Sequence, residues 1–195
     1  MESTYQLHVV VAIGLILLLG FSVSEVSQAV ADTATSSTHD APGIVAERLS
    51  AALVTIPPLS DRSRIRRNLA QATFCLPQNI LGTLLHASLQ LFGAVVDVGY
   101  FNEMTLVITS CPIGVSLGKT IVLPEPFLTE RYVRHEYGHT LQGYRHGPFY
   151  LLLEGLTSFV QAGFSLISPS FAANYYQRWP ENEANELGGN TRSFP

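Results

Sequence analysis

The sequence contains little positive charge for its length. Its 195 residues include 11 lysines and arginines and 15 aspartates and glutamates, which gives a net charge of −4. A chain with this net negative charge lacks the positively charged surface that binds a nucleic acid, and we expect no nucleic-acid partner. Its basic cluster, Arg62, Arg64, Arg66 and Arg67, holds few charges, and we interpret it as the solvated face of a helix.

Cysteine is also scarce, because the chain has only two, Cys75 and Cys111. Two thiols this far apart do not form a zinc site by themselves. In an oxidising compartment they are able to form one disulfide, and otherwise they are two buried free thiols. The sequence leaves both alternatives open.

The start of the chain lacks a positively charged region, because residues 1–8 contain no lysine or arginine. A run that is apolar apart from His8, small residues and Ser22 nevertheless extends over residues 7–23, at the lower limit of length for a helix that spans a bilayer. Ala29 and Ala31 then provide an A-x-A step suited to cleavage by signal peptidase. We expect residues 1–31 to be a signal peptide or a membrane anchor.

Residues 32–43 are rich in serine, threonine and alanine without an apolar period, which is typical of a linker. The whole chain has 47% hydrophobic residues, and the part after residue 43 is long enough for one domain and too short for two. We therefore expect a single folded domain at residues 44–195. It is either exported or anchored to a membrane through the N-terminal segment, and in both cases it lies outside the cytoplasm.

Apolar periodicity and turn residues predict a mainly helical α+β domain. Short β-branched runs between turn residues predict three strands in a meander, at residues 95–98, 105–109 and 120–123. Helical patterns precede and follow the strands, at residues 46–55, 60–74, 79–92, 127–143, 149–167 and 180–187. Ser60 or Asp61 is placed to cap the second of these helices.

Residues 149–167 are apolar enough for either a buried core helix or a membrane-associated one. Glu154, Gln161 and Ser165 interrupt this segment, which argues against a simple lipid-facing span. We expect a helix buried in the core.

His135, Glu136 and His139 form the motif His-Glu-x-x-His inside the predicted helix 127–143. Two histidines four residues apart on a helix project from one face, so both imidazoles are able to reach one Zn²⁺ ion. Glu136 lies beside them and is placed to take a proton from a water molecule. The motif predicts a zinc hydrolase site, which needs a third ligand from elsewhere in the chain.

The first candidate for the third ligand is His146, which lies three residues after Gly143. Metzincins use H-E-x-x-H-x-x-G-x-x-H, which has the same spacing between its glycine and its last histidine. This chain, however, has one extra residue between His139 and Gly143. One helical residue rotates the exit of the chain by about 100°, so His146 fits this pattern poorly.

The second candidate is Glu154, which resembles the Glu-Gly segment that supplies the third ligand in gluzincin aminopeptidases. Its neighbours are apolar, and burying a carboxylate is costly unless it is paired or binds a metal. A salt bridge to Arg134 or Arg145 would satisfy Glu154 equally well.

The third candidate is Glu181, in the segment Glu-Asn-Glu-Ala-Asn that ends at Asn185. This segment resembles the glutamate helix of small gluzincin-type zinc peptidases, the minigluzincins. The resemblance implies that Glu181 binds zinc and that Asn185 hydrogen-bonds a histidine ligand, a position at which such proteins usually have aspartate. The small Ala184 would allow this helix to approach the helix of the His-Glu-x-x-His motif closely.

The resemblance extends over residues 95–190 to a group of small bacterial proteins that contain HEYGH and have no defined activity. It rests on separated segments at residues 116–118, 135–142, 147–151, 175–176 and 179–189. It implies a zincin-like domain, with a short β meander before the motif helix and a glutamate helix after it.

The expected activity is zinc-dependent hydrolysis of peptide bonds in a peptide or protein, with Glu136 as general base. The strand at residues 120–123 would pair with an extended substrate. Tyr137, Tyr144 and Tyr150 are candidates to stabilise the oxyanion. Two alternatives remain, namely a membrane-tethered structural or binding protein whose zinc is non-catalytic or absent, and an intramembrane zinc protease.

Overall fold

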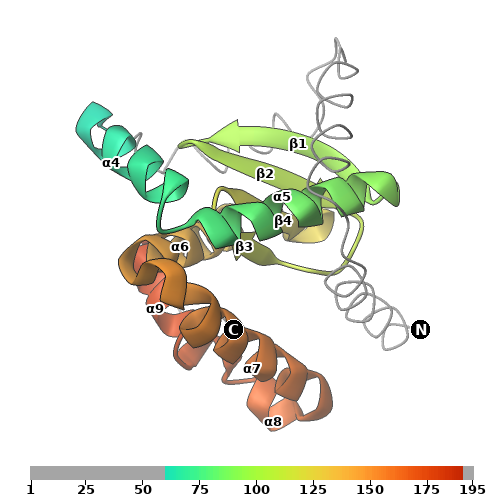
Figure 1. The fold of residues 1–195 in the computed structure, drawn as a ribbon. Helices are drawn as coiled ribbons and strands as arrows, with labels where there is room; N and C mark the ends of the chain where they lie inside the picture. Colours follow the sequence, from blue (N-terminus) through green and yellow to red (C-terminus); the bar gives the residue numbers. More distant parts are fainter. Residues whose placement is uncertain (1–59, 191–195) are drawn as a thin grey trace.

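The computed structural model describes residues 60–190. The expected leader and linker, and the helix predicted at residues 46–55, lie outside these residues. The described part is α+β, as the sequence predicts, and consists of helices packed around a small mixed sheet (Figure 1).

The N-terminal half contains two helices and all strands of the described residues. These elements are α4 (Asp61–Ala72), α5 (Leu76–Leu91), β1 (Val95–Phe101), β2 (Met104–Thr109), β3 (Val115–Leu117) and β4 (Thr120–Pro124). The C-terminal half is helical, with α6 (Glu130–His146), α7 (Leu156–Ile167), α8 (Pro169–Ala172) and α9 (Glu181–Leu187) as its α-helices. Short turns of other helix types join them, namely η1 (Glu125–Phe127), η2 (Gly147–Phe149), the π-helix η3 (Leu151–Gly155) and η4 (Tyr175–Gln177).

The strand order is β1-β2-β4-β3, so the predicted three-stranded meander is wrong. β1 and β2 form an antiparallel hairpin whose turn residues, Asn102 and Glu103, have φ angles of 46° and 67°. The chain then forms the short strand β3, turns at Gly118 with a φ of 59°, and returns as β4 between β2 and β3. β4 is therefore parallel to β2 and lies inside the sheet, and the edge strands are β1 and β3.

Alternation along β2 and β4 divides the core into two layers. Leu106 and Ile108 point to the face that α6 covers, where they pack in one cluster with Val133. Val107 points to the opposite face and packs in a second cluster with Leu89 of α5. The sheet is therefore sandwiched between α5 and α6, and α6 packs against its central strands.

Local signals explain how α4 and α5 begin and end. The Ser60 side chain accepts a hydrogen bond from the backbone of Ser63 at 3.3 Å, so Ser60 is the N-cap of α4. Gly93, with a φ of 65°, ends α5 and allows the Ala94 N–H to donate to Leu89 O at 2.8 Å.

One member of the basic cluster departs from the expected solvated face. Arg67 is buried, its guanidinium donates to Tyr137 Oη at 2.7 Å, and it also lies over the ring of Tyr144. The other three arginines of the cluster are exposed. Cys75 and Cys111 are both free thiols, and Cys75 is buried, which raises the pKa of its thiol.

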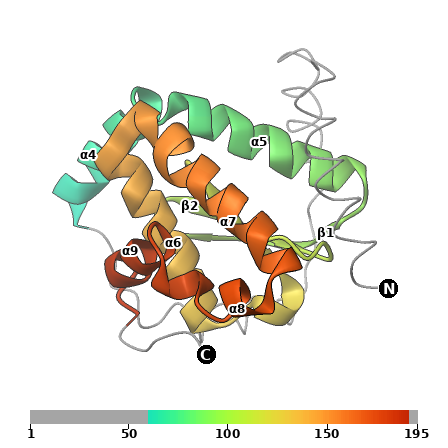
Figure 2. The same cartoon turned by 90° about the horizontal axis from the view of Figure 1, so that it is seen from below.

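The helix expected to be buried at residues 149–167 is largely exposed. η2, the π-helix η3 and α7 replace it, and no residue of α7 is buried. α7 and α8 pack against each other and extend away from the sheet (Figure 1), and Figure 2 shows the same pair from below. Among residues 60–190, no single helix is long and apolar enough to cross a membrane, although Glu130–Phe149 and Leu151–Ile167 pass that test as a pair bent by 113°.

Candidate metal centre

The structure brings together His135 and His139 of α6 and Glu181, the first residue of α9. The imidazole Nε2 atoms of the two histidines lie 3.1 Å and 3.3 Å from Glu181 Oε2. The potential ligand atoms of the three side chains all lie within 4.8 Å of one another, and all three residues are buried. Two imidazoles and a carboxylate this close together are able to bind a metal ion.

An amide oxygen contacts the Nδ1 atom of each imidazole, on the side of the ring away from Glu181. His135 Nδ1 lies 3.0 Å from Asn185 Oδ1, and His139 Nδ1 lies 2.8 Å from Gln142 Oε1. Since an amide oxygen only accepts, each Nδ1 must carry its proton and donate. In a neutral imidazole the lone pair is then on Nε2, which faces Glu181.

The orientation of the Gln142 amide follows from its other contacts. Its Nε2 donates to Pro180 O at 2.9 Å and to Glu183 Oε2 at 3.2 Å. Both partners accept hydrogen bonds, so the amide nitrogen must face them and the amide oxygen must face His139.

Three acceptors that face one another in a buried space require a cation between them. A proton fills that role in the metal-free protein. Burial lowers the pKa of His139, but the hydrogen bond and the charge of Glu181 outweigh burial, and the net effect raises this pKa to about 9. Burial raises the pKa of Glu181, but the hydrogen bonds of the two histidines outweigh burial and hold this pKa well below its usual range. Two imidazoles and a carboxylate are also a donor set that suits zinc.

Small residues allow α9 to lie directly on α6. A Cβ atom added at Gly138, inside the His-Glu-x-x-His motif, would lie 1.8 Å from Ala184 O. A Cβ atom added at Gly188 would lie 1.9 Å from Arg134 O. Ala184 itself is fully buried. Because the backbones of α6 and α9 lie in close contact, Glu181 at the start of α9 is placed next to the two histidines.

Glu136 projects from α6 toward the edge strand β3. The hydroxyl of Ser116 lies 2.7 Å from Glu136 Oε2 and 2.8 Å from Glu136 O. A Cβ atom at Gly114, just before β3, would lie 3.0 Å from Glu136 Oε1, so the backbone passes close to this carboxylate. The charge of Glu136 also contributes to the raised pKa of His139.

Of the tyrosines expected near the reacting atoms, Tyr137 and Tyr144 are engaged elsewhere. Tyr137 Oη accepts a hydrogen bond from Arg67, and Tyr144 Oη accepts one from Gln71 Nε2 at 2.6 Å. Tyr150 is buried near the centre, and its hydroxyl donates to Ser116 O at 3.3 Å. Burial and the nearby charge of Glu136 raise the pKa of Tyr150 well above its usual value.

The structure does not bring Glu154 or His146 to the two histidines. Glu154 is fully buried and pairs with His146 Nδ1, instead of pairing with Arg134 or Arg145. Burial raises the pKa of Glu154. The alternative third ligand is therefore outside the cluster, because the π-helix that carries it points its side chain to the end of α6.

The sequence motif does not identify every residue of the centre. Gln142 follows His139 by three residues, and this helical spacing is the signal that could have identified it. The rings of Tyr176 and His135 pack edge to face, with ring centroids 5.2 Å apart. Ser116 and Gly188 lie in segments on which the resemblance rests, but no local pattern predicts their contacts, since their partners lie far away in the sequence.

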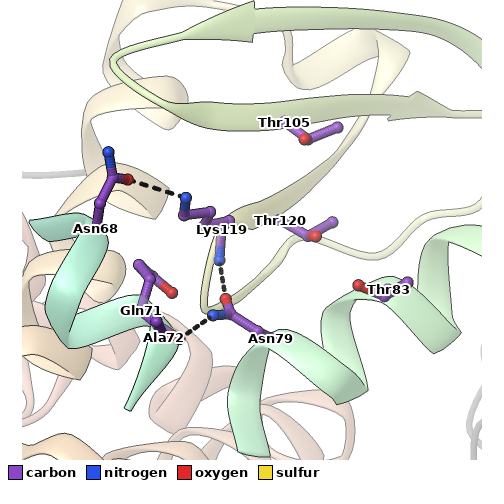
Figure 3. A pocket seen from close by; sticks show the side chains of 8 residues that line it. All are labelled: Asn68, Gln71, Ala72, Asn79, Thr83, Thr105, Lys119 and Thr120. Carbon is purple, nitrogen blue, oxygen red and sulfur yellow. Dashed lines mark hydrogen bonds between the residues drawn. The ribbon is translucent and has the colours of Figure 1, made fainter. Parts of the chain in front are cut away.

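A separate cavity of about 400 Å³ lies between α4, α5 and the sheet (Figure 3). At this cavity Lys119 Nζ donates to Asn68 Oδ1 at 3.0 Å, and the Lys119 backbone N–H donates to Asn79 Oδ1 at 2.8 Å. Its lining residues include none of the metal-centre side chains.

Comparisons of the chain with protein-family models, curated proteins and solved structures find no match.

Proposed function

We propose that this protein is a zinc-dependent peptidase in which His135, His139 and Glu181 bind the metal and Glu136 is the general base. The observation that carries the proposal is the convergence of the two histidine Nε2 atoms on Glu181 Oε2, with both rings held from behind by amide oxygens. Catalytic zinc sites use three protein ligands whose orientation is fixed in this way. The resemblance of the α9 segment to the glutamate helix of minigluzincins supports the same assignment.

A zinc ion held by His135, His139 and Glu181 would supply Lewis-acid chemistry, which polarises a carbonyl group and makes a water molecule more acidic. Glu136 takes the proton of the attacking water and returns it to the leaving amine. The hydroxyl of Ser116 orients the Glu136 carboxylate for this task.

The edge strand β3 is the better candidate for pairing with an extended peptide, since β4 lies inside the sheet. β3 passes the Glu136 carboxylate at Gly114 and Ser116. A peptide on this edge would present its backbone beside the general base.

A zinc that only stabilises the fold normally has four protein ligands. Within residues 60–190, the candidate metal-binding group has three members, and Glu136, which follows His135 directly in sequence, does not belong to it. A ligand set that leaves one position for water favours catalysis over a purely structural ion.

Replacing Glu136 with glutamine tests the general base. Glu136→Gln is expected to reduce cleavage of a peptide mixture, followed by mass spectrometry, by about 10²- to 10⁴-fold while bound zinc is unchanged. Glu186→Gln, on the exposed side of α9, is the matched control and should retain both activity and zinc. Unchanged cleavage by the Glu136 variant would contradict the assignment of Glu136 as the general base.

Replacing the two candidate glutamates tests the third ligand. Glu181→Gln is expected to lose zinc, because it removes the charge that the two histidines face. Glu154→Gln should keep zinc, because Glu154 pairs with His146 outside the cluster. Zinc measured by atomic absorption in the reverse pattern would show that Glu154 is the ligand.

A further inference from the structure

The segment between His146 and Arg178 is almost free of charged residues. Residues 147–177 contain no lysine, arginine, histidine or aspartate, and their only acidic residue is Glu154. The Glu154 side chain is fully buried. The surface of this segment therefore carries no charged side chain.

Large apolar side chains cover the outer side of α7 and of the π-helix before it. Each of them is between 45% and 76% exposed, and the set consists of Leu152, Leu153, Leu156, Phe159, Val160, Phe164, Leu166 and Ile167. We refer to these eight residues as the apolar face. A contiguous patch of this kind on a protein surface marks an interaction site.

The polar side chains of α7 lie on its inner side. Gln161 Nε2 donates to Trp179 O at 2.7 Å, and Ser158 Oγ lies 3.3 Å from Tyr175 Oη. The Ser165 hydroxyl donates back to Gln161 O within the helix. A helix on a water-exposed surface has the opposite arrangement, with its apolar stripe inward and its polar stripe outward. The inverted arrangement is expected where the surroundings of the helix are apolar.

We propose that the apolar face embeds in the hydrocarbon region of a lipid bilayer. An interface with another protein carries about one hydrogen bond per 100 to 200 Å², and the apolar face has no side-chain donor or acceptor to make one. Residues suited to the polar boundary of a bilayer stand at the ends of the segment, namely Arg145 before it and Arg178 and Trp179 after it. Trp179 is 44% exposed.

This arrangement brings the metal centre close to the membrane surface. Gln161 on the inner side of α7 holds the carbonyl of Trp179, which lies two residues before Glu181. The diameter of one helix, about 10 Å, therefore separates the apolar face from the segment that leads into α9.

Tryptophan fluorescence in the full chain tests the proposal without using zinc or activity. Trp179 is the only tryptophan, so Trp179→Phe leaves a background into which one new reporter is introduced by Phe159→Trp. In vesicles of phosphatidylcholine brominated along its acyl chains, we expect this reporter to lose most of its emission. Leu69→Trp in the same background is the matched control, because Leu69 is 63% exposed on α4, which carries exposed arginines. Its emission should be unchanged.

Two other fluorescence results would each overturn the proposal. A reporter at position 159 that is quenched no more than the one at position 69 overturns the proposal. A blue-shifted reporter at position 159 without quenching shows that protein covers the face, either a second copy or another part of this chain, and overturns it as well. Val160→Trp provides a second reporter on the same face if the first variant fails to fold, as judged by circular dichroism.

Discussion

At the scale of single residues, the amides behind the histidines decide how firmly the centre holds a metal. Asn185 Oδ1 accepts from His135 Nδ1 and also from Asn190 Nδ2 at 3.1 Å. Asn185→Ala removes the acceptor and leaves the imidazole free to rotate. We expect zinc affinity, measured by competition with a chelating dye, to fall about 10- to 100-fold.

The aspartate variant at the same position is the control for this prediction. Asn185→Asp keeps an acceptor opposite His135 Nδ1, so its zinc affinity should remain within a few-fold of the original chain. Equal losses for the alanine and aspartate variants would mean that Asn185 acts through packing and not through the imidazole.

These residues also show how far the sequence predicts the centre. The two histidines and Glu136 follow from a local spacing on one helix, which a sequence displays directly. Glu181 was one of three candidates for the third ligand, and only the packing of α9 on α6 brings it to the histidines while Glu154 stays with His146. Ser116 could not be assigned, because its contact with Glu136 joins residues that no local pattern connects.

At the scale of elements, the crossing of α6 and α9 controls the third ligand. A methyl group at Gly138 would collide with the backbone of Ala184, so Gly138→Ala must push α9 away from α6. We expect a loss of about 1 to 3 kcal/mol of folding free energy in chemical denaturation and a large loss of zinc affinity, since Glu181 moves with α9.

Gly163→Ala is the matched control for this change. A Cβ atom at Gly163, also inside a helix, has nothing within 4 Å. This substitution should be neutral or should stabilise the protein by up to about 1 kcal/mol, because alanine favours helix more than glycine does. Full zinc affinity in the Gly138 variant would refute the role assigned to the crossing.

The elements themselves were predicted unevenly from the sequence. The helix that carries the motif and the β1 and β2 strands follow from period and turn residues. The strand β3 and the parallel pairing of β2 with β4 were missed, because pairing depends on partners distant in the sequence. The periodicity of α7 distinguishes a polar stripe from an apolar stripe. It does not show which stripe packs against the rest of the protein.

At the scale of the whole molecule, pH is expected to control metal uptake. His139 has a pKa of about 9 in the metal-free protein, above the ordinary value of 6.5, so it carries a proton at pH 7 that zinc must displace. We expect zinc uptake near pH 7 to release about one proton, measured by calorimetry in buffers of different ionisation enthalpy. The apparent affinity should rise by up to about tenfold per pH unit and level off near pH 9.

Calorimetry of a second metal provides the control for this prediction. Co²⁺ binds the same kinds of ligand, so its uptake should release the same number of protons. Zinc affinity that is constant between pH 7 and pH 9 would contradict the paired state of His139 and Glu181.

The separation of 42 residues between His139 and Glu181 has a consequence for biosynthesis. A ribosome that adds about 5 to 20 residues per second takes about 2 to 8 s to cover that stretch. During this interval the nascent chain displays the two histidines without the carboxylate. A zinc ion captured then is held by an incomplete set and is easily lost to other cellular binders. With His135, His139 and Glu181 as the proposed ligands, durable metallation would therefore begin only after α9 has been translated and has docked against Gly138.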